Sequence, residues 1–161
     1  MRPTTLEDLL RPAGAVEVDA NLATLSEALR LAPGLVVPLV DDLRSMRLMA
    51  EVTQADLDAA RRGSSADVCE LRASDVSRPP VTCLLSDTPE ASLAIMRSHE
   101  RAVLHVVDSR GRLCGSLSIE DVFAWSDDVA REANAPAFLR TALAPWHPSG
   151  RDTRFARPAG R

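Results

Sequence analysis

The residues best suited to hold a ligand lie where an apolar strand runs into a helix, in the sequence Gly115-Ser116-Leu117-Ser118-Ile119-Glu120-Asp121. A carboxylate at the start of this helix, on Asp121, could accept two hydrogen bonds from a ribose diol. Ser118 and the free first-turn amides could donate to a phosphate. Gly115 would let such a ligand approach the backbone closely. Ser-x-x-Asp is also a capping pattern that stabilises a helix start without any ligand, and the residues alone favour capping.

This pattern occurs twice in the chain. Thr53 and Asp56 are followed by Ser118 and Asp121 at one and the same sequence offset, and the strand-to-strand turns before them differ in length by two residues. In both places an apolar strand leads to the turn, and a second apolar strand leads into the motif. The regularity indicates an internal duplication, in which each copy positions a motif of its own.

Each copy is predicted to fold as helix, strand, helix, strand, strand and helix. Thr4 or Thr5 is expected to cap the first helix, which Pro12 and Gly14 would end. The other elements of the first copy are expected at residues 16–18, 22–32, 35–40, 47–52 and 53–63. Those of the second copy are expected at 73–77, 81–84, 89–99, 103–107, 113–117 and from 118 onward.

Two such copies resemble the cystathionine-β-synthase (CBS) domain pair, also called a Bateman module, here as a free-standing pair. The resemblance is carried by VVD (106–108) and GRLCGSLSIED (111–121) in the second copy, and by LVD (39–41) and LMAEVTQAD (48–56) in a degenerate first copy. It implies an α/β (α+β) fold of tandem CBS domains. Two small β-sheets with flanking helices would be related by a pseudo-two-fold axis, with two clefts between them.

The resemblance also divides the chain into regions. Residues 4–63 would be CBS domain 1, residues 64–72 a linker, and residues 73–126 CBS domain 2. Residues 127–161 would be a C-terminal extension, helical at first and then disordered. The Pro, Gly, Ser and Arg composition beyond Pro145 cannot bury enough apolar surface to order itself.

The function implied by the resemblance is regulation or sensing rather than catalysis, through adenosine-containing ligands. Our first hypothesis is a sensor that binds AMP, ADP, ATP or S-adenosylmethionine at Ser118 and Asp121, requires no cofactor, and changes its contacts with itself or a regulated protein partner. The family also implies a homodimer. The alternative from another class is a ligand-free dimerisation or protein-docking module.

Four basic residues beside the second motif are candidates for neutralising a phosphate: Arg97, His99, Arg101 and His105. Arg97 and Arg101 could equally be solvated surface charges. Family members often have a basic residue two positions before a proline on this strand, where this chain has Val103 and His105. That departure leaves a nucleoside, an adenosyl compound or an empty cleft as options.

Apolar walls for a purine are expected from Val81, Thr82 and Val103. Residues of these types are more often part of a core, and that alternative stays open. The binding set considered for the second motif therefore combines these three residues with Gly115, Ser118 and Asp121 of the motif and with Arg101 and His105.

The first copy departs from the family pattern at three positions. Ala50 replaces the usual glycine, Glu51 places an acid near the cleft, and Met46 stands where the second copy has its turn glycine. An added negative charge should disfavour a phosphate, because like charges at short range repel strongly when partly shielded from water. Although Thr53 and Asp56 keep the motif, we expect at most one good nucleotide site.

Composition excludes several other functions. The net charge is −4, and all 19 basic residues are arginine, which argues against a nucleic-acid partner. No window approaches the roughly 20 apolar residues of a membrane span, so no membrane partner and a cytoplasmic location are expected. The sequence has no HExxH, GxSxG or Walker-type motif, so we expect no enzyme activity, no catalytic residues and no metal ligands.

Overall fold

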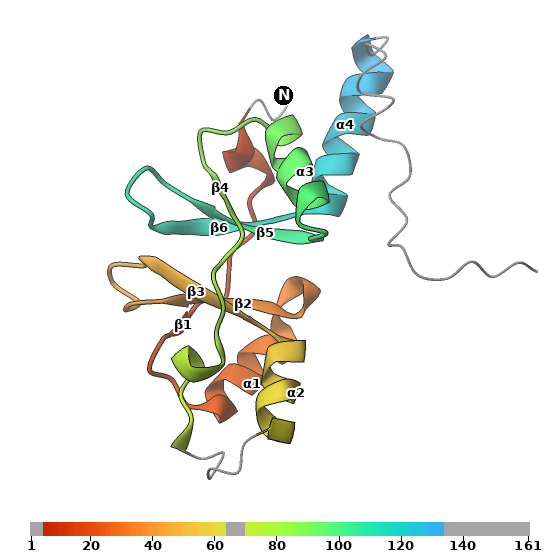
Figure 1. Cartoon of the computed structure of the whole chain (residues 1–161). Helices are drawn as coiled ribbons and strands as arrows, with labels where there is room; N and C mark the ends of the chain where they lie inside the picture. The colour runs from red at the N-terminus through yellow and green to blue at the C-terminus, as the bar shows by residue number, and fades with distance from the viewer. Residues whose placement is uncertain (1–4, 64–69, 134–161) are drawn as a thin grey trace, which may run out of the picture.

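The computed structural model describes residues 5–63 and 70–133 of the chain. Two three-stranded sheets lie one above the other, and each is covered by helices on its outer side (Figure 1). The first half holds β1 (Val16–Glu17), α1 (Leu22–Leu31), β2 (Val36–Val40), β3 (Leu48–Thr53) and α2 (Gln54–Gly63). The second half holds β4 (Thr82–Leu84), α3 (Pro89–Ser98), β5 (Val103–Val107), β6 (Leu113–Ser118) and α4 (Ile119–Ala133). The described chain also has short 3-10 segments: η1 (Leu6–Leu9) before β1, η2 (Pro33–Leu35) between α1 and β2, and η4 (Ala73–Val76) before β4.

The two sheets have the same topology and the same register. In each sheet the first strand pairs in parallel with the second, which pairs antiparallel with the third. Val37 lies opposite Val52 in one sheet, and Leu104 lies opposite Leu117 at the equivalent place in the other. Both ladders also shift register before the last residue of the second strand. The predicted duplication and the tandem α/β fold are therefore confirmed.

The central strand of each sheet is covered on both faces, which explains its nearly continuous apolar sequence. In β5, Leu104 and Val106 belong to the core between the sheet and its helices. His105, between them, is 1% exposed and faces the other half of the molecule. Its partner there is Glu51 of the first half.

The long helices begin and pack as their sequences predict. Asn21 caps α1 by accepting a hydrogen bond from the Thr24 amide at 2.9 Å. Thr88 caps α3 by accepting from the Ala91 amide at 3.2 Å, and Pro89 occupies the first helical turn. Each helix buries its apolar face: Leu22, Leu25 and Leu29 in α1, and Leu93 and Met96 in α3.

The helix expected near the N-terminus is only a four-residue 3-10 turn, η1, and the expected cap is wrong. The Thr5 hydroxyl makes no cap hydrogen bond and instead lies 3.5 Å from the Asp8 carboxylate. Thr4 lies outside the described residues. So short a segment has little helix to cap, and its position is set by the burial of Leu6.

The short segment before the strands of each half, η1 in the first and η4 in the second, packs against the opposite half. We call these the lead-in segments. Leu6 of η1 is buried in the core of the second half with Met96 and Leu104. Ala73 of η4 is buried in the core of the first half with Leu57, and it donates its amide to Ala20 at 2.8 Å. In Figure 1 the red N-terminal segment begins beside α3 and descends to β1, while the green segment rises from η4 to β4. The exchange ties the halves into one body, and the domain boundaries given above stay a prediction.

The strand-to-strand hairpins of the two halves also pair with each other. The Leu48 amide donates to the Gly111 carbonyl at 3.0 Å, and the Leu113 amide donates to the Met46 carbonyl at 2.8 Å. Both turns need a residue with positive φ. Gly111 has φ +75° and Met46, at the equivalent position, has φ +55°. Met46 is therefore held in a conformation that favours glycine.

The variant Met46→Gly is expected to raise the free energy of unfolding by about 0.5 kcal/mol, because relief of the left-handed strain exceeds the entropy that glycine adds to the unfolded chain. Gly111→Ala should lower it by about 1 kcal/mol, although a Cβ there would meet nothing within 4 Å. Urea denaturation of both variants beside the unmodified chain measures the two effects. Changes of the same sign would contradict the assignment of strain to these turns.

Candidate functional site

Both Ser/Thr-x-x-Asp motifs form reciprocal caps at the start of a helix. In the second copy the Ser118 hydroxyl donates to Asp121 Oδ2 at 2.7 Å, and the Asp121 amide donates to Ser118 Oγ at 3.2 Å. In the first copy the corresponding distances between Thr53 and Asp56 are 2.6 and 3.3 Å. The two motifs thus have the same local geometry, and both serve as helix caps.

An arginine from outside the motif is paired with each motif carboxylate. Arg11 Nε and Nη2 donate to the two oxygens of Asp121 at 2.7 and 2.6 Å. Arg78 Nε lies 3.4 Å from Asp56 Oδ2. The hydrogen bond from Arg11, helped by Ser118, holds the pKa of Asp121 below its ordinary value of 3.8. The two arginines stand at equivalent positions of the repeat and each precedes a proline, a signal that sequence reasoning missed.

Each of these arginines is also fixed by its backbone to the strand before the motif. Arg11 exchanges two backbone hydrogen bonds of 2.9 Å with Ser116, and Arg78 exchanges two of 3.0 Å with Glu51. This pairing changes the interpretation of Gly115. A Cβ on Gly115 would lie 2.7 Å from the Arg11 carbonyl oxygen, so the close approach that the glycine permits is made by the chain itself and not by a ligand.

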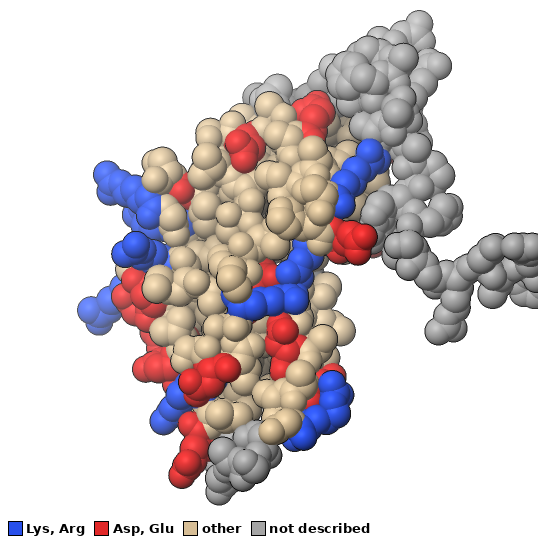
Figure 2. Space-filling view, viewed as in Figure 1, with Lys and Arg blue, Asp and Glu red and all other residues tan. Residues whose placement is uncertain are grey.

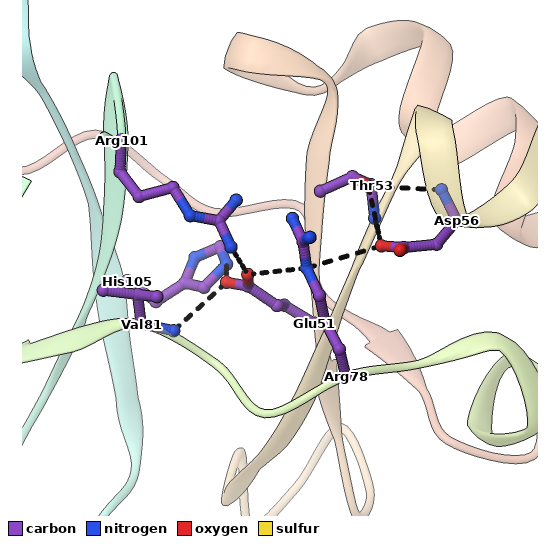
Figure 3. A network of polar contacts seen from close by, with 7 residues as sticks. All are labelled: Glu51, Thr53, Asp56, Arg78, Val81, Arg101 and His105. Atoms are coloured by element: carbon purple, nitrogen blue, oxygen red, sulfur yellow. Dashed lines mark hydrogen bonds and ion pairs between the residues drawn. The ribbon is translucent and has the colours of Figure 1, made fainter. Parts of the chain in front are cut away.

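A network of polar contacts surrounds Glu51, a buried acid that is 2% exposed (Figure 3). Its Oε1 accepts a hydrogen bond from Arg101 Nη2 at 2.5 Å and lies 3.3 Å from Arg78 Nε. Its Oε2 accepts from the Val81 amide at 3.3 Å and lies 3.4 Å from His105 Nε2. We call the group formed by these five residues with Thr53 and Asp56 the first site.

Burial alone would raise the pKa of Glu51, since a charge removed from water is disfavoured. The contact with His105, the positive charge of Arg101 and the Val81 amide outweigh that effect, so the pKa of Glu51 lies below its ordinary value of 4.5. The carboxylate is therefore charged at neutral pH, and its charge is balanced by groups from the second half. Figure 2 shows basic and acidic side chains meeting at this junction between the halves.

Several residues expected to contact a ligand at Ser118 and Asp121 lie elsewhere. Arg101, His105 and Val81 contact Glu51 in the first site, because their side chains and amide point across from one half to the other. The expectation that Arg101 and His105 are available to a phosphate beside the second motif does not hold in this structure.

The remaining predicted residues are distributed over the second half. Val103 lies opposite Ser118 in the β5–β6 ladder, so it adjoins the second motif, whereas Thr82 pairs with His105 at the start of β4. Arg97 is half-buried on α3, and its Nε donates no hydrogen bond among the described residues. His99 is exposed at the end of α3.

Equivalent positions around the second motif carry much smaller groups. We call the group equivalent to the first site the second site. It comprises Arg11, Ser116, Ser118, Asp121 and the residues equivalent to Val81, Arg101 and His105. When the two copies are superposed along the sequence, Glu51 corresponds to Ser116 and Arg78 to Arg11. Val81, Arg101 and His105 correspond to Gly14, Gly34 and Pro38. The side chains of Glu51, Arg101 and His105 occupy the first site. The second site has no charged side chains at the equivalent positions.

Two hollows adjoin the second site, and Arg11 lines both of them. One, of about 370 Å³, is lined by Arg11 and Asp121 together with Asp8, Leu9, Leu10, Ala124 and Trp125. The other, of about 570 Å³, is lined by Pro12, Gly14, Ala15, Ala28, Leu31 and Ala32. The second hollow is apolar and large enough for a flat ring, and the first offers a carboxylate at a helix start.

The part of the chain that the structure describes contains no group of three or more His, Cys, Asp or Glu side chains arranged to hold a metal ion. Within the same residues, no helix combines the length and the apolar composition needed to cross a membrane.

Comparisons with known proteins follow the same division between the halves. Residues 73–128 match the family model described as CBS domain. None of the curated proteins searched matches the chain. The match covers the copy that departs least from the pattern.

Solved structures share the whole two-sheet arrangement. The CBS-pair protein CBSX2 from Arabidopsis thaliana is 21% identical, with a TM-score of 0.64 over 81% of this chain and 99% of that chain. The CBS domain protein PAE2072 from Pyrobaculum aerophilum, complexed with AMP, is 24% identical, with a TM-score of 0.60 over 73% and 88%. At these identities the likeness concerns the fold.

The cytosolic domain of the Mg²⁺ channel MgtE, in complex with ATP, is 25% identical, with a TM-score of 0.61 over 75% of this chain. The match covers 48% of that chain, so it spans about half its length.

Replacing the central carboxylate should leave an anion site without its anion. The variant Glu51→Ala is expected to lower the free energy of unfolding by about 3 kcal/mol, because Arg101 and Arg78 lose a buried partner. Inorganic phosphate should then raise the melting temperature of this variant more than that of the unmodified chain. Glu27→Ala, which removes an exposed ion pair with Arg30, is the control and should change neither quantity appreciably. A phosphate effect equal in all three proteins would contradict the assignment.

The lowered pKa of Glu51 makes stability depend on pH. A carboxyl whose pKa falls on folding contributes stability that is present above its unfolded pKa, near 4.5, and is lost as the pH falls through the folded value. Glu51→Gln should therefore lose less unfolding free energy than the unmodified chain between about pH 6 and pH 4. Denaturation at several pH values measures the difference, and parallel profiles would rule out this role for Glu51.

Proposed function

We propose that this protein is a non-catalytic regulatory module, because residues 73–128 match the family model of a CBS domain and the described chain shares the fold of solved CBS-pair structures. It binds one adenosine-containing ligand per chain, at the second site. The observation that carries this proposal is the contrast between the sites. The first is occupied by Glu51 and its partners, whereas the second has Asp121 at a helix start beside two hollows.

The chemistry of the second site suits the parts of a nucleoside. Asp121 is charged and could accept hydrogen bonds from a ribose diol, as a carboxylate with several acceptor lone pairs can. The apolar hollow beside Arg11, walled by Pro12, Ala15 and Leu31, could take the purine. Ser116 and Gly34 stand where the first site has Glu51 and Arg101, so no bulky charged side chain takes up this space.

Solved relatives support the ligand class. CBSX2 has been solved in complex with AMP, as has PAE2072, and the MgtE domain has been solved with ATP. This chain shares their fold and holds a motif carboxylate, Asp121, at a strand-to-helix junction. An adenine nucleotide or adenosyl compound, acting as a regulatory ligand rather than a cofactor, is the ligand we propose.

One observation favours the alternative of a ligand-free docking module. Both motif carboxylates are already paired with arginines of the same chain, so each helix start is satisfied without a ligand.

In either case we propose a homodimer that acts on a protein partner, and light scattering coupled to gel filtration tests the dimer. The cytoplasmic location stays a prediction.

A thermal-shift series with AMP, ADP, ATP and S-adenosylmethionine tests the proposed ligand. At 100 times its dissociation constant a ligand adds about 2.7 kcal/mol to the free energy of unfolding, so at least one compound should raise the melting temperature by several degrees.

Two variants localise the effect. Asp121→Ala should abolish the shift, whereas Asp56→Ala, which removes the equivalent cap in the first site, should keep it. Each variant is compared with its own unliganded form, so a lower starting stability does not interfere. No shift with any compound, or a shift that Asp121→Ala leaves unchanged, would overturn the proposal.

A further inference from the structure

Resting on the proposed function, we propose that Arg11 is a selectivity switch. It blocks Asp121 in the unliganded protein and leaves it only for a ligand that brings an anion of its own. The second site would accordingly bind 5′-phosphorylated adenosines in preference to adenosine.

Arg11 and a ribose diol would compete for one carboxylate, that of Asp121. Arg11 uses two nitrogens on the two oxygens of Asp121, at 2.7 and 2.6 Å, and Ser118 takes a further lone pair of Oδ2. A ribose diol would donate one hydroxyl to each carboxylate oxygen, but Oδ2 already accepts from both Arg11 and Ser118, and Oδ1 accepts from Arg11. The diol and Arg11 therefore cannot both be bound to Asp121.

The side chain of Arg11 can move while its backbone stays in place. The backbone is held by two hydrogen bonds to Ser116 and lies so close to Gly115 that a Cβ there would be 2.7 Å from the Arg11 carbonyl. The side chain is 59% exposed, and it lines both hollows. A ligand can thus displace the guanidinium without unfolding the segment that carries it.

The displaced charge of Arg11 needs a new partner. In the first site, Arg78 lies near both Asp56 and Glu51, so it would keep one carboxylate if it lost the other. Arg11 has no such second partner on the strand, because Ser116 stands at the position of Glu51. When Arg11 is displaced from Asp121, an ion pair is lost. A phosphate on the ligand can form a new ion pair with Arg11, whereas a neutral nucleoside cannot.

The charges around the entrance work in the same direction. Asp8 and Asp121 line the smaller hollow, and Glu120 lies next to Asp121 along α4. Among the described residues that line the two hollows, Arg11 is the only basic one. Without it a phosphate would lie beside acidic side chains with no cation to balance its charge, so the residue that excludes adenosine is also the one that admits a nucleotide.

Calorimetric titration with AMP and with adenosine tests the proposal on the unmodified chain and on Arg11→Ala. The unmodified chain should bind AMP at least about tenfold more tightly than adenosine, the worth of one charge-assisted contact. In Arg11→Ala this ratio should fall to about threefold or less, with adenosine binding more tightly than before. Arg112→Ala is the matched control, since Arg112 pairs with Asp108 through Nε and Nη2 and is 54% exposed. It should keep the original ratio.

The outcomes separate this inference from the function on which it rests. Binding of both compounds with the same ratio in the unmodified chain and Arg11→Ala would overturn the switch and leave the site standing. Failure of AMP, ADP, ATP, S-adenosylmethionine and adenosine alike to bind either protein would overturn the proposed function, and the switch with it. A loss of the preference in Arg112→Ala as well would also overturn the switch, because the effect would then follow net charge rather than Arg11.

Discussion

The buried carboxylate of Glu51 determines how the two halves of this molecule differ. It extends from the first sheet into the second half, where Arg101, His105 and the Val81 amide surround it, and Arg78 approaches from the segment between η4 and β4. A buried charge is tolerated only when it is paired and hydrogen-bonded. The need to satisfy Glu51 therefore fixes the positions of all four partners. The group that results occupies one of two equivalent sites, and the other is the site proposed to take a ligand.

The exchange of lead-in segments explains why each site contains parts of the chain that are distant in sequence. Arg11 precedes the strands of the first copy but pairs with Asp121 of the second, and Arg78 precedes the strands of the second copy but lies at Asp56 of the first. Each segment crosses to the opposite half to bury an apolar side chain, such as Leu6 or Ala73. The arginine beside each motif is carried there by that burial. Ligand binding at the second site would thereby be felt by the N-terminal segment.

Local sequence patterns were sufficient for most of the elements, the duplication and the caps of the two motifs, because apolar spacing and capping depend on neighbouring residues. The N-terminal helix was the exception, since η1 is placed by the burial of Leu6. They also marked Glu51 as unfavourable to a phosphate and Met46 as a turn residue without glycine. Contacts between the halves could not be predicted in this way. Arg101 and His105 were placed beside the motif nearest in sequence, whereas the fold turns them toward Glu51. Arg11 was missed, since its only signal was the recurrence of Arg-Pro at the equivalent position of the second copy.

The proposed function requires that the second site binds the ligand and that the first site does not. The most direct measurement is an NMR titration of the isotope-labelled chain with AMP, followed at the backbone amides of the two motifs and at the Arg11 Nε. The account predicts that signals of Ser118, Asp121 and Arg11 shift and saturate at one equivalent of AMP, while those of Thr53 and Asp56 stay in place. Shifts at Thr53 and Asp56, or saturation at two equivalents, would contradict it.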